Sequence, residues 1–176
     1  MGIKGVFEMA FKQIDPNAFT AKPFADLGKN WALLTAGKED AFNSMTVSWG
    51  AAGELWGKHV VFVFVRPQRY TYEFCEKNDY MSLSIMPDGY QKQLGVFGRK
   101  SGRDCDKYAE TGLTAAFCDE TAYCEEAQSV FVLKKIAAFD FDPDSFIDKS
   151  IIPDCYPNHD FHRVYVGEIT KLLVKE

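Results

Sequence analysis

Apolar residues recur in short runs along the chain, and the period of these runs predicts a protein built mainly from β-strands. Six runs have the length of strands, and several alternate apolar and polar residues with a period of two. They cover residues 31–36, 45–49, 60–65, 80–85, 130–141 and 164–174. Helical patterns fit better at residues 70–77, 90–97 and 107–110. These helices are short and lie between strands, so we expect them to cover the openings of a barrel.

The run at residues 60–65 is apolar on both faces of the expected strand. It contains only valine and phenylalanine, so neither face suits contact with water. One face fits the inside of a barrel, and the other needs a covering helix or a second subunit. We expect a homodimer to supply this cover, and a monomer with a covering helix is the alternative.

The chain of 176 residues has the length of one ordinary domain, and we assign residues 1–176 to it. No internal repeat or low-complexity linker divides it. Long helices do not alternate with the strands, and no Gly-x-Gly-x-x-Gly fingerprint is present. A doubly wound sheet is therefore disfavoured, and a closed Greek-key β-barrel with short helices is the expected fold.

Composition narrows the classes of protein that this fold can represent. The hydrophobic fraction of 47% and the charged fraction of 26% are those of an ordinary globular protein. The formal net charge of −5 argues against general nucleic-acid binding, which relies on a basic surface. The longest apolar strand is far too short to span a bilayer, and the first residues carry no secretory pattern. We expect a soluble, cytoplasmic protein that binds neither nucleic acid nor membrane.

The stretch at residues 43–50 alternates hydroxyl and apolar side chains. The hydroxyls belong to Ser44, Thr46 and Ser48, and the apolar groups to Met45, Val47 and Trp49. As a strand, this stretch turns its hydroxyls to one side, where they suit the polar edge of a ring. A half-solvated strand with no ligand gives the same pattern and is the alternative.

A second motif, at residues 65–71, joins an apolar strand to the start of a helix at about Thr71. Unpaired backbone N–H groups and the helix dipole favour a phosphate at such a position. Arg66 or Arg69 can clamp the phosphate, although most arginines in such turns are solvated or paired with a carboxylate. Together with the hydroxyl-rich stretch, this motif suits flavin mononucleotide (FMN).

Cysteine and histidine give weaker signals. The five cysteines form an odd set without a Cys-x-x-Cys pair, so we expect reduced thiols, with a redox pair of Cys118 and Cys124 as the alternative. Three histidines, at positions 59, 159 and 162, show no shared spacing for a metal. We therefore assign no metal site.

Five motifs occur in an order that resembles the flavin reductase-like family. They lie at residues 31–37, 43–49, 65–67 with Thr71, 100–104 with 106–107, and 162–169. Members of this family bind FMN on a split β-barrel and include flavoredoxins and NAD(P)H:flavin oxidoreductases. The motifs extend over most of the chain, so the resemblance implies this fold for the whole domain.

The resemblance also implies roles for individual residues. The stretch at residues 43–49 would lie along the isoalloxazine and ribityl chain, with its backbone N–H groups and hydroxyls as donors. The phosphate would be held by Arg66 and the helix start at Thr71, with Arg69 as a second candidate for this role. The loop with Lys100, Ser101 and Arg103 would approach the flavin, and Lys107 would direct a positive charge toward it. The predicted cofactor site therefore consists of Asn43, Ser44, Met45, Thr46, Val47, Ser48, Trp49, Arg66, Arg69, Thr71, Lys100, Ser101, Arg103 and Lys107.

The family places a histidine near the flavin or the nicotinamide at the position of His162, which is the one catalytic candidate. The alternative for His162 is to tie down the end of the last strand. The alternative for residues 100–103 is a solvated basic turn whose serine caps a short helix. A nicotinamide channel would involve Tyr90, Phe97 or residues 153–162.

The resemblance implies an oxidoreductase that takes a hydride from NADH or NADPH and passes electrons from FMN to an acceptor. The acceptor would be a free flavin, a redox-protein partner or another small molecule, and FMN would lie near the interface of a homodimer. A flavoredoxin-type electron carrier without NAD(P)H turnover is the alternative. A barrel that binds an oligonucleotide without flavin is disfavoured by the acidic charge.

Overall fold

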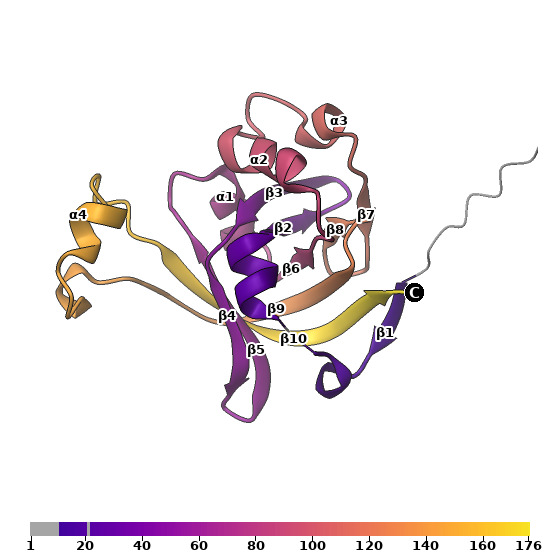
Figure 1. Ribbon diagram of the computed structural model, residues 1–176, viewed down its shortest axis with the longest axis horizontal. Helices are drawn as coiled ribbons and strands as arrows, with labels where there is room; N and C mark the ends of the chain where they lie inside the picture. Colours follow the sequence, from indigo (N-terminus) through magenta and orange to yellow (C-terminus); the bar gives the residue numbers. More distant parts are fainter. Residues whose placement is uncertain (1–10, 21) are drawn as a thin grey trace, which may run out of the picture.

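The computed structural model describes residues 11–20 and 22–176. Its strands are β1 (Phe11–Ile14), β2 (Ala32–Lys38), β3 (Ala41–Val47), β4 (Gly50–Leu55), β5 (Lys58–Val65), β6 (Tyr80–Ile85), β7 (Ala115–Phe117), β8 (Ala122–Cys124), β9 (Ser129–Asp140) and β10 (Arg163–Lys175). The α-helices are α1 (Tyr70–Lys77), α2 (Gln91–Arg99), α3 (Lys107–Thr111) and α4 (Ile151–Cys155), and the short turns of helix are η1 (Pro16–Ala18), η2 (Phe24–Lys29) and η3 (Pro143–Ser145). The predicted class, mainly β with short helices, is confirmed (Figure 1).

The main sheet is antiparallel and its two ends are joined by a very short connection. The strand order is β3-β2-β6-β9-β10-β5-β4, with β1 added beside β10. The edge strands β3 and β4 are consecutive in the chain, and only Ser48 and Trp49 separate them. No ladder joins β3 to β4 in the part of the chain that the structure describes. The expected barrel is therefore left open between these two strands, because the chain crosses the gap there instead of pairing.

The strands are held by apolar packing on both faces of the sheet. On β2, Leu34 enters one cluster with Met45, Val63 and Leu133, while its neighbour Leu33 enters the other. The second cluster includes Leu94 and Phe97 of α2, so this helix covers one face of the sheet. Burial of a large apolar side chain contributes about 1.5–3 kcal/mol, so these alternating positions fix the register of β2.

Several predicted elements were found, and others were missed or too long. The helix at residues 70–77 coincides with α1, and the last two long strands agree with β9 and β10 to within a residue or so. The strand at residues 45–49 was wrong at its end, because β3 stops at Val47. Strand β4 was missed because its run of alanine and glycine has no β-branched residue, and it forms by pairing with β5.

The segment between β9 and β10, residues 141–162, is here called the arm. It contains η3 and α4 and projects away from the barrel (Figure 1). Aromatic side chains hold it together: Phe146 packs against Phe141, Tyr156 and Phe161 with ring centroids 5.7–5.9 Å apart. The arm is also joined to β5, because Phe64 stacks on Phe141 at 5.7 Å. The arm thus covers part of the outer face of β5 that the sequence left open.

Membrane insertion through a helix has no support in the described residues. None of the helices in the ranges 11–20 and 22–176 combines the length and the apolar character that crossing a bilayer demands.

Candidate functional site

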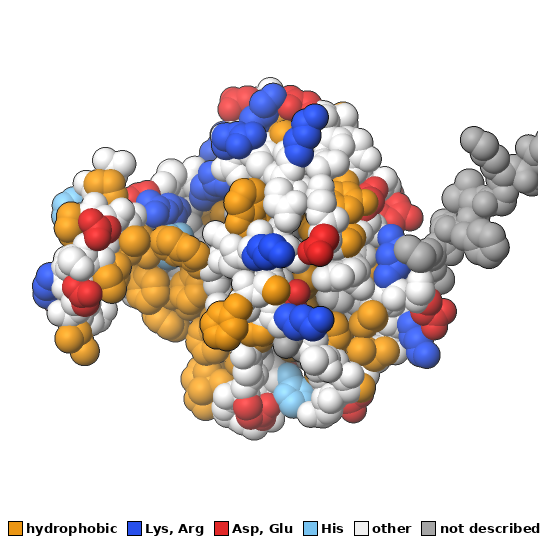
Figure 2. All heavy atoms as spheres, viewed as in Figure 1, with side chains coloured by type: hydrophobic (Ala, Val, Ile, Leu, Met, Phe, Trp, Pro, Cys, Tyr) orange, Lys and Arg blue, Asp and Glu red, His pale blue; other side chains and the backbone are white. Residues whose placement is uncertain are grey.

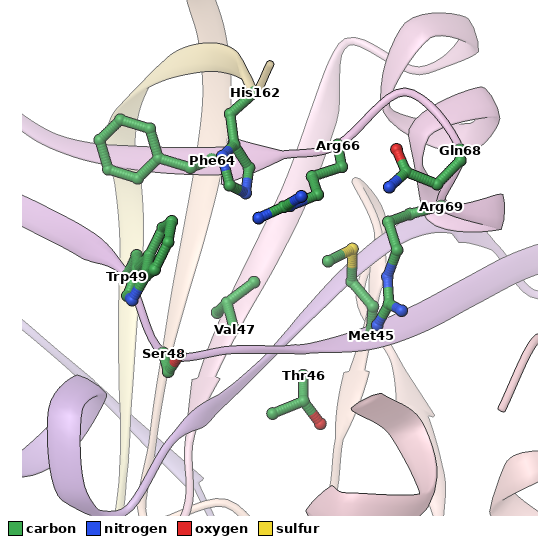
Figure 3. A pocket seen from close by; sticks show the side chains of 10 residues that line it. All are labelled: Met45, Thr46, Val47, Ser48, Trp49, Phe64, Arg66, Gln68, Arg69 and His162. Carbon is green, nitrogen blue, oxygen red and sulfur yellow. The ribbon is translucent and has the colours of Figure 1, made fainter. Parts of the chain in front are cut away.

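A cavity of about 360 Å³ opens where the chain passes from β3 to β4. Side chains from the end of β3, the end of β5, the turn that follows β5 and the last residue of the arm converge on it (Figure 3). The lining residues are Met45, Thr46, Val47, Ser48, Trp49, Phe64, Arg66, Gln68, Arg69 and His162. The cavity therefore lies at the gap in the main sheet, and eight of its ten lining residues belong to the predicted cofactor site or are the catalytic candidate.

The sequence suggested that the hydroxyl face of β3 meets the ligand, but the apolar face is the one that looks toward the basic residues. Met45 and Val47 point to the side on which the basic residues and His162 lie, whereas Thr46 points to the opposite side (Figure 3). The Thr46 hydroxyl donates to the carbonyl of Leu94 at 2.5 Å. The Ser44 hydroxyl is buried and shares hydrogen bonds with the hydroxyls of Thr35 and Tyr108, at 2.7 and 2.9 Å.

Burying a hydroxyl without a partner is costly, and the hydroxyls of Ser44 and Thr46 already pair with neighbours inside the protein. Thr46 also lines the cavity, so its contact with a ring stays a prediction. The apolar side chains of Met45 and Val47 supply the β3 face that looks toward the basic residues.

Arg66 is held by the arm. Its Nη1 donates to Oδ2 of Asp160 at 2.6 Å, and its Nη2 donates to the carbonyl of Cys155 at 2.7 Å. The guanidinium also lies over the ring of Tyr156, 5.1 Å from its centroid. Hydrogen bonding from Arg66 lowers the pKa of Asp160. Arg66 thus follows the alternative in which the arginine of the turn pairs with a carboxylate, although its side chain still borders the cavity.

A second, smaller cavity of about 160 Å³ adjoins the first, since Met45, Gln68 and Arg69 line both. Its other walls are the start of α1, the end of α2, Asn43 of β3 and the loop before α3. It is markedly basic, because five cationic side chains line it: Arg69, Arg99, Lys100, Arg103 and Lys107.

The five cations differ in whether they have a carboxylate partner. Lys100 pairs with Glu110 at 2.6 Å, and Arg103 pairs with Glu73. No carboxylate of the described residues lies within 4 Å of the charged group of Arg69, Arg99 or Lys107. The second cavity therefore carries positive charge that the protein itself does not neutralise.

Two of these cations are withdrawn from water. Arg69 donates from Nη2 to the carbonyl of Gly98 at 2.7 Å, and burial, followed by the neighbouring charge of Arg66, lowers its pKa. Lys107 is only 5% exposed and donates from Nζ to the carbonyl of Ser44. Burial, followed by the charge of Arg69, lowers the pKa of Lys107 to about 8. Buried like charges destabilise each other, and an anion between them would relieve this cost.

The start of α1 adds donors to the same cavity. The first N–H groups of an α-helix have no acceptor within the helix, so those of Tyr70 and Thr71 suit an anion. Asn43 donates from Nδ2 to the hydroxyl of Thr71 at 2.7 Å, and both residues are buried. Gly102 packs so closely here that a Cβ would lie 2.1 Å from Oδ1 of Asn43. These contacts fix the loop before α3 against the helix start.

His162 lies on the wall of the larger cavity. It is 8% exposed, and its Nδ1 shares a hydrogen bond of 2.8 Å with the hydroxyl of Tyr156 in the arm. Its ring packs against the indole of Trp49 at 5.3 Å. Burial, followed by the charge of Arg66, lowers the pKa of His162 to about 4. The imidazole is therefore neutral at neutral pH, and Figure 3 shows it between Phe64 and Arg66.

The remaining predictions have mixed outcomes. Ser101 lines the second cavity and accepts a hydrogen bond from the backbone N–H of Arg103 at 3.2 Å. The helix cap that the alternative gave to this serine is instead supplied to α3 by Asp106. Phe97 lines the second cavity, whereas Tyr90 lines neither of the two cavities. The five cysteines are free, and burial raises the pKa of Cys118 and of Cys124.

Several lining residues were not among those predicted, namely Phe64, Gln68, Tyr70, Arg99 and Gly102. All five lie within two residues of a predicted site residue, so the local motifs gave a usable signal for them. Arg99 ends α2 directly before the predicted Lys100.

The gap in the sheet, the basic cavity and the order of the motifs define the class of protein. The flavin reductase like domain matches residues 24–176, which is most of the chain. The chain therefore belongs to the flavin reductase-like family, and the resemblance drawn from its motifs is confirmed.

Solved structures show how widely this fold is used. A flavoredoxin from Methanosarcina acetivorans has a TM-score of 0.66 and 19% identity, covering 84% of this chain and 69% of its own. An FMN-binding domain of a flavin reductases-like enzyme from Shewanella baltica has a TM-score of 0.66 and 14% identity, covering 96% and 78%. An NADH:FAD oxidoreductase from Streptomyces globisporus, in complex with NAD and FAD fragments, has a TM-score of 0.62 and 13% identity, covering 85% and 76%. At these identities the likeness establishes the fold alone. No functionally curated protein matches the sequence.

Proposed function

We propose that the protein binds FMN across the two adjoining cavities and acts as an NAD(P)H-dependent oxidoreductase. The observation that carries FMN binding is a pair of cations, the buried Lys107 and the half-buried Arg69, which have no carboxylate partner among the described residues. They lie beside the start of α1, so charge, dipole and free N–H groups all favour a phosphate at one place.

The larger cavity fits the other end of the ligand. A volume of about 360 Å³ is typical of a small-molecule site. Its walls are apolar or aromatic at Met45, Val47, Trp49 and Phe64, and neutral but polar at His162. A planar ring packs favourably on such walls. The residues present therefore fit FMN, with the phosphate in the basic cavity and the ring in the larger one.

Bound FMN would supply the chemistry of hydride acceptance and electron transfer. The chain contributes binding and orientation. Arg69, Lys107 and the α1 start would hold the phosphate, and Arg66 would add a positive field from a position already shared with Asp160. His162 would offer a neutral imidazole at the cavity wall, in an orientation fixed by its hydrogen bond to Tyr156. We keep His162 as the catalytic candidate on this basis.

Two relatives favour different uses of the flavin. The Streptomyces globisporus neighbour is named as an NADH:FAD oxidoreductase, which supports a reductase that uses NADH or NADPH. The Methanosarcina acetivorans neighbour is named as a flavoredoxin, which supports an electron carrier that serves a redox-protein partner. We propose the reductase and keep the carrier as the second candidate.

We also propose a homodimer with FMN near the interface. Trp49 is 49% exposed and lines the larger cavity, and Trp56 at the β4–β5 turn is 65% exposed. Figure 2 shows apolar side chains gathered in the recess between the arm and the body of the molecule. Large exposed apolar surfaces favour association, and a second copy here would enclose the ring end of the site.

An anaerobic titration tests the function. The purified protein is loaded with FMN, freed of unbound flavin and titrated with NADH or NADPH while the visible flavin band is recorded. Bleaching by either nucleotide supports the reductase, and bleaching only by dithionite supports the carrier. Failure to bind FMN contradicts both. Sedimentation of the FMN-loaded protein tests the dimer, which a monomer at micromolar concentration would contradict.

A further inference from the structure

Lys107 is unusual among the basic residues of the second cavity because it is almost completely buried. It opens α3 and reaches across to β3, where its Nζ donates to the carbonyl of Ser44. Its ammonium lies 5.3 Å from the centroid of the Phe97 ring of α2. Lys107 lines the basic cavity and also the cavity on the other side of Gly102. An anion bound in the basic cavity would therefore lie beside this ammonium.

The charged groups around Lys107 come from every element that packs against it, and they leave it without a counter-ion. From the start of α1 comes Arg69, and from the end of α2 comes Arg99. In the loop before α3, Lys100 and Arg103 are paired with Glu110 and Glu73. The other polar residues that line a cavity together with Lys107 are Cys105, Asp106, Tyr108 and the uncharged Asn43 and Ser44.

The carboxylate next to Lys107 in the sequence, that of Asp106, already has hydrogen-bond partners. Asp106 accepts the N–H groups of Tyr108 and Ala109 at 3.0 and 3.1 Å, and so caps α3. Glu110 and Glu73 each hold another cation. Burial raises the pKa of Tyr108, so this residue stays neutral. The protein therefore surrounds Lys107 with a carbonyl, an aromatic ring and a second cation, and no carboxylate of the described residues lies within 4 Å of its Nζ.

A buried ammonium without a counter-ion releases its proton more readily than one in water, and a nearby anion restores the proton. The pKa of Lys107, lowered to about 8 by burial and by Arg69, agrees with this geometry. A phosphate monoester has its second pKa near about 6 and is a dianion above pH 7. The dianion would supply the charge that the site lacks, so phosphate and proton would favour each other's binding.

We propose that Lys107 is the proton-linked counter-ion of the phosphate, so that flavin phosphate binds with uptake of a proton and is released as the pH rises. This inference rests on the proposed function, because it places the FMN phosphate in the basic cavity. The specificity that follows is for a dianionic phosphomonoester over an uncharged flavin. Retention of the cofactor would then weaken under alkaline conditions without any change in the ring site.

The test measures FMN dissociation constants between pH 6.5 and 9.5 by quenching of flavin fluorescence. For a free-protein pKa of about 8, the linkage predicts affinity about tenfold weaker at pH 9 than at pH 7. Lys107→Arg keeps a permanent charge and should remove this slope. Lys107→Met should weaken FMN binding at pH 7 and also remove the slope. Lys92→Met, on the exposed side of α2, is the matched control and should keep the wild-type slope.

Riboflavin, which lacks the phosphate, separates the phosphate site from the ring site. Its affinity should not change between pH 7 and pH 9 or on Lys107→Met. Calorimetry of FMN binding at pH 8.5, in two buffers of different ionisation enthalpy, should show uptake of a fraction of a proton in wild type and none in Lys107→Arg. If Lys107 had only a structural role, FMN binding would take up no proton at this residue, and the heat of binding would not depend on the buffer.

The outcomes are distinguishable. FMN binding with the same affinity at pH 7 and pH 9, or a slope that survives in Lys107→Arg, overturns the proton linkage and leaves the proposed function standing. Failure of the wild-type protein to bind FMN at pH 7 overturns the proposed function and the linkage together.

Discussion

Arg66 and Arg69 lie three residues apart in the turn between β5 and α1, yet the fold places their charges in opposite situations. Arg66 is paired with Asp160 of the arm and donates a second hydrogen bond to the Cys155 carbonyl. Arg69 donates to the Gly98 carbonyl and meets no carboxylate of the described residues. The difference shows that a basic motif specifies where cations lie, whereas distant segments decide which cation is left for a ligand.

The largest expected effect compares these two arginines directly. Arg69→Met should weaken FMN binding by about 10²- to 10³-fold, because truncating one partner of a partly buried charge-assisted contact costs about 2–5 kcal/mol. Arg66→Met should weaken it by about tenfold or less, since Asp160 already offsets its charge. Flavin fluorescence measures both constants. A larger effect at Arg66 than at Arg69 would reverse the comparison.

His162 extends the comparison to the arm side. Its folded-state pKa of about 4 lies below the value of about 6.5 in an unfolded chain. The unfolded chain therefore binds more protons at this histidine. The contribution of the neutral His162 to the free energy of unfolding is fully present above about pH 6.5 and is lost as the pH falls toward 4. The loss at pH 4 reaches about 3 kcal/mol. Urea unfolding measures the free energy of unfolding at pH 7 and pH 4, and the difference between the two values should be smaller in His162→Gln than in wild type. Equal differences would contradict the lowered pKa of His162.

The packing of Gly102 holds the phosphate side together. In Gly102→Ala the new Cβ would lie 2.1 Å from Oδ1 of Asn43 and 3.3 Å from the ring of Tyr70. The loop before α3 must move, at a cost of about 1–3 kcal/mol in unfolding free energy. Gly53→Ala is the control, because no atom lies within 4 Å of its Cβ. Thermal unfolding measures the two variants, and equal effects would show that the contact is easily relieved.

The smallest effect is expected when Arg66 is released from its ion pair with Asp160. Asp160→Asn removes the negative charge that holds this arginine to the arm. The full charge of Arg66 then acts on the cavity, and FMN affinity should rise about two- to fivefold, in line with the modest strength of partly exposed ion pairs. Sodium chloride titration of the binding constant provides the control, because the gain should fall with salt. An unchanged affinity would show that Arg66 does not act on the phosphate.

Local patterns were enough to predict many elements of this protein. Period-two alternation predicted the strands at residues 80–85 and 164–174 because successive side chains of a strand point to opposite faces of the sheet, although both faces of β6 are buried here. The turn at residues 65–71 was predicted because a proline and a helix start leave a local signature. The arm and β4 were missed because long-range contacts hold them in place, through aromatic packing and through pairing with β5.

The site divides in the same way. The motifs alone were enough to predict which residue types gather at the site, since Met45, Arg69 and Lys107 all line cavities. Only the tertiary structure decided which face of β3 meets the cavity, because the hydroxyls of Ser44 and Thr46 find partners in distant strands and helices. It also decided which cations stay unpaired, because a carboxylate such as Asp160 lies 94 residues from Arg66 in the chain. Charge pairing depends on distance in space, and that distance is set by the fold as a whole.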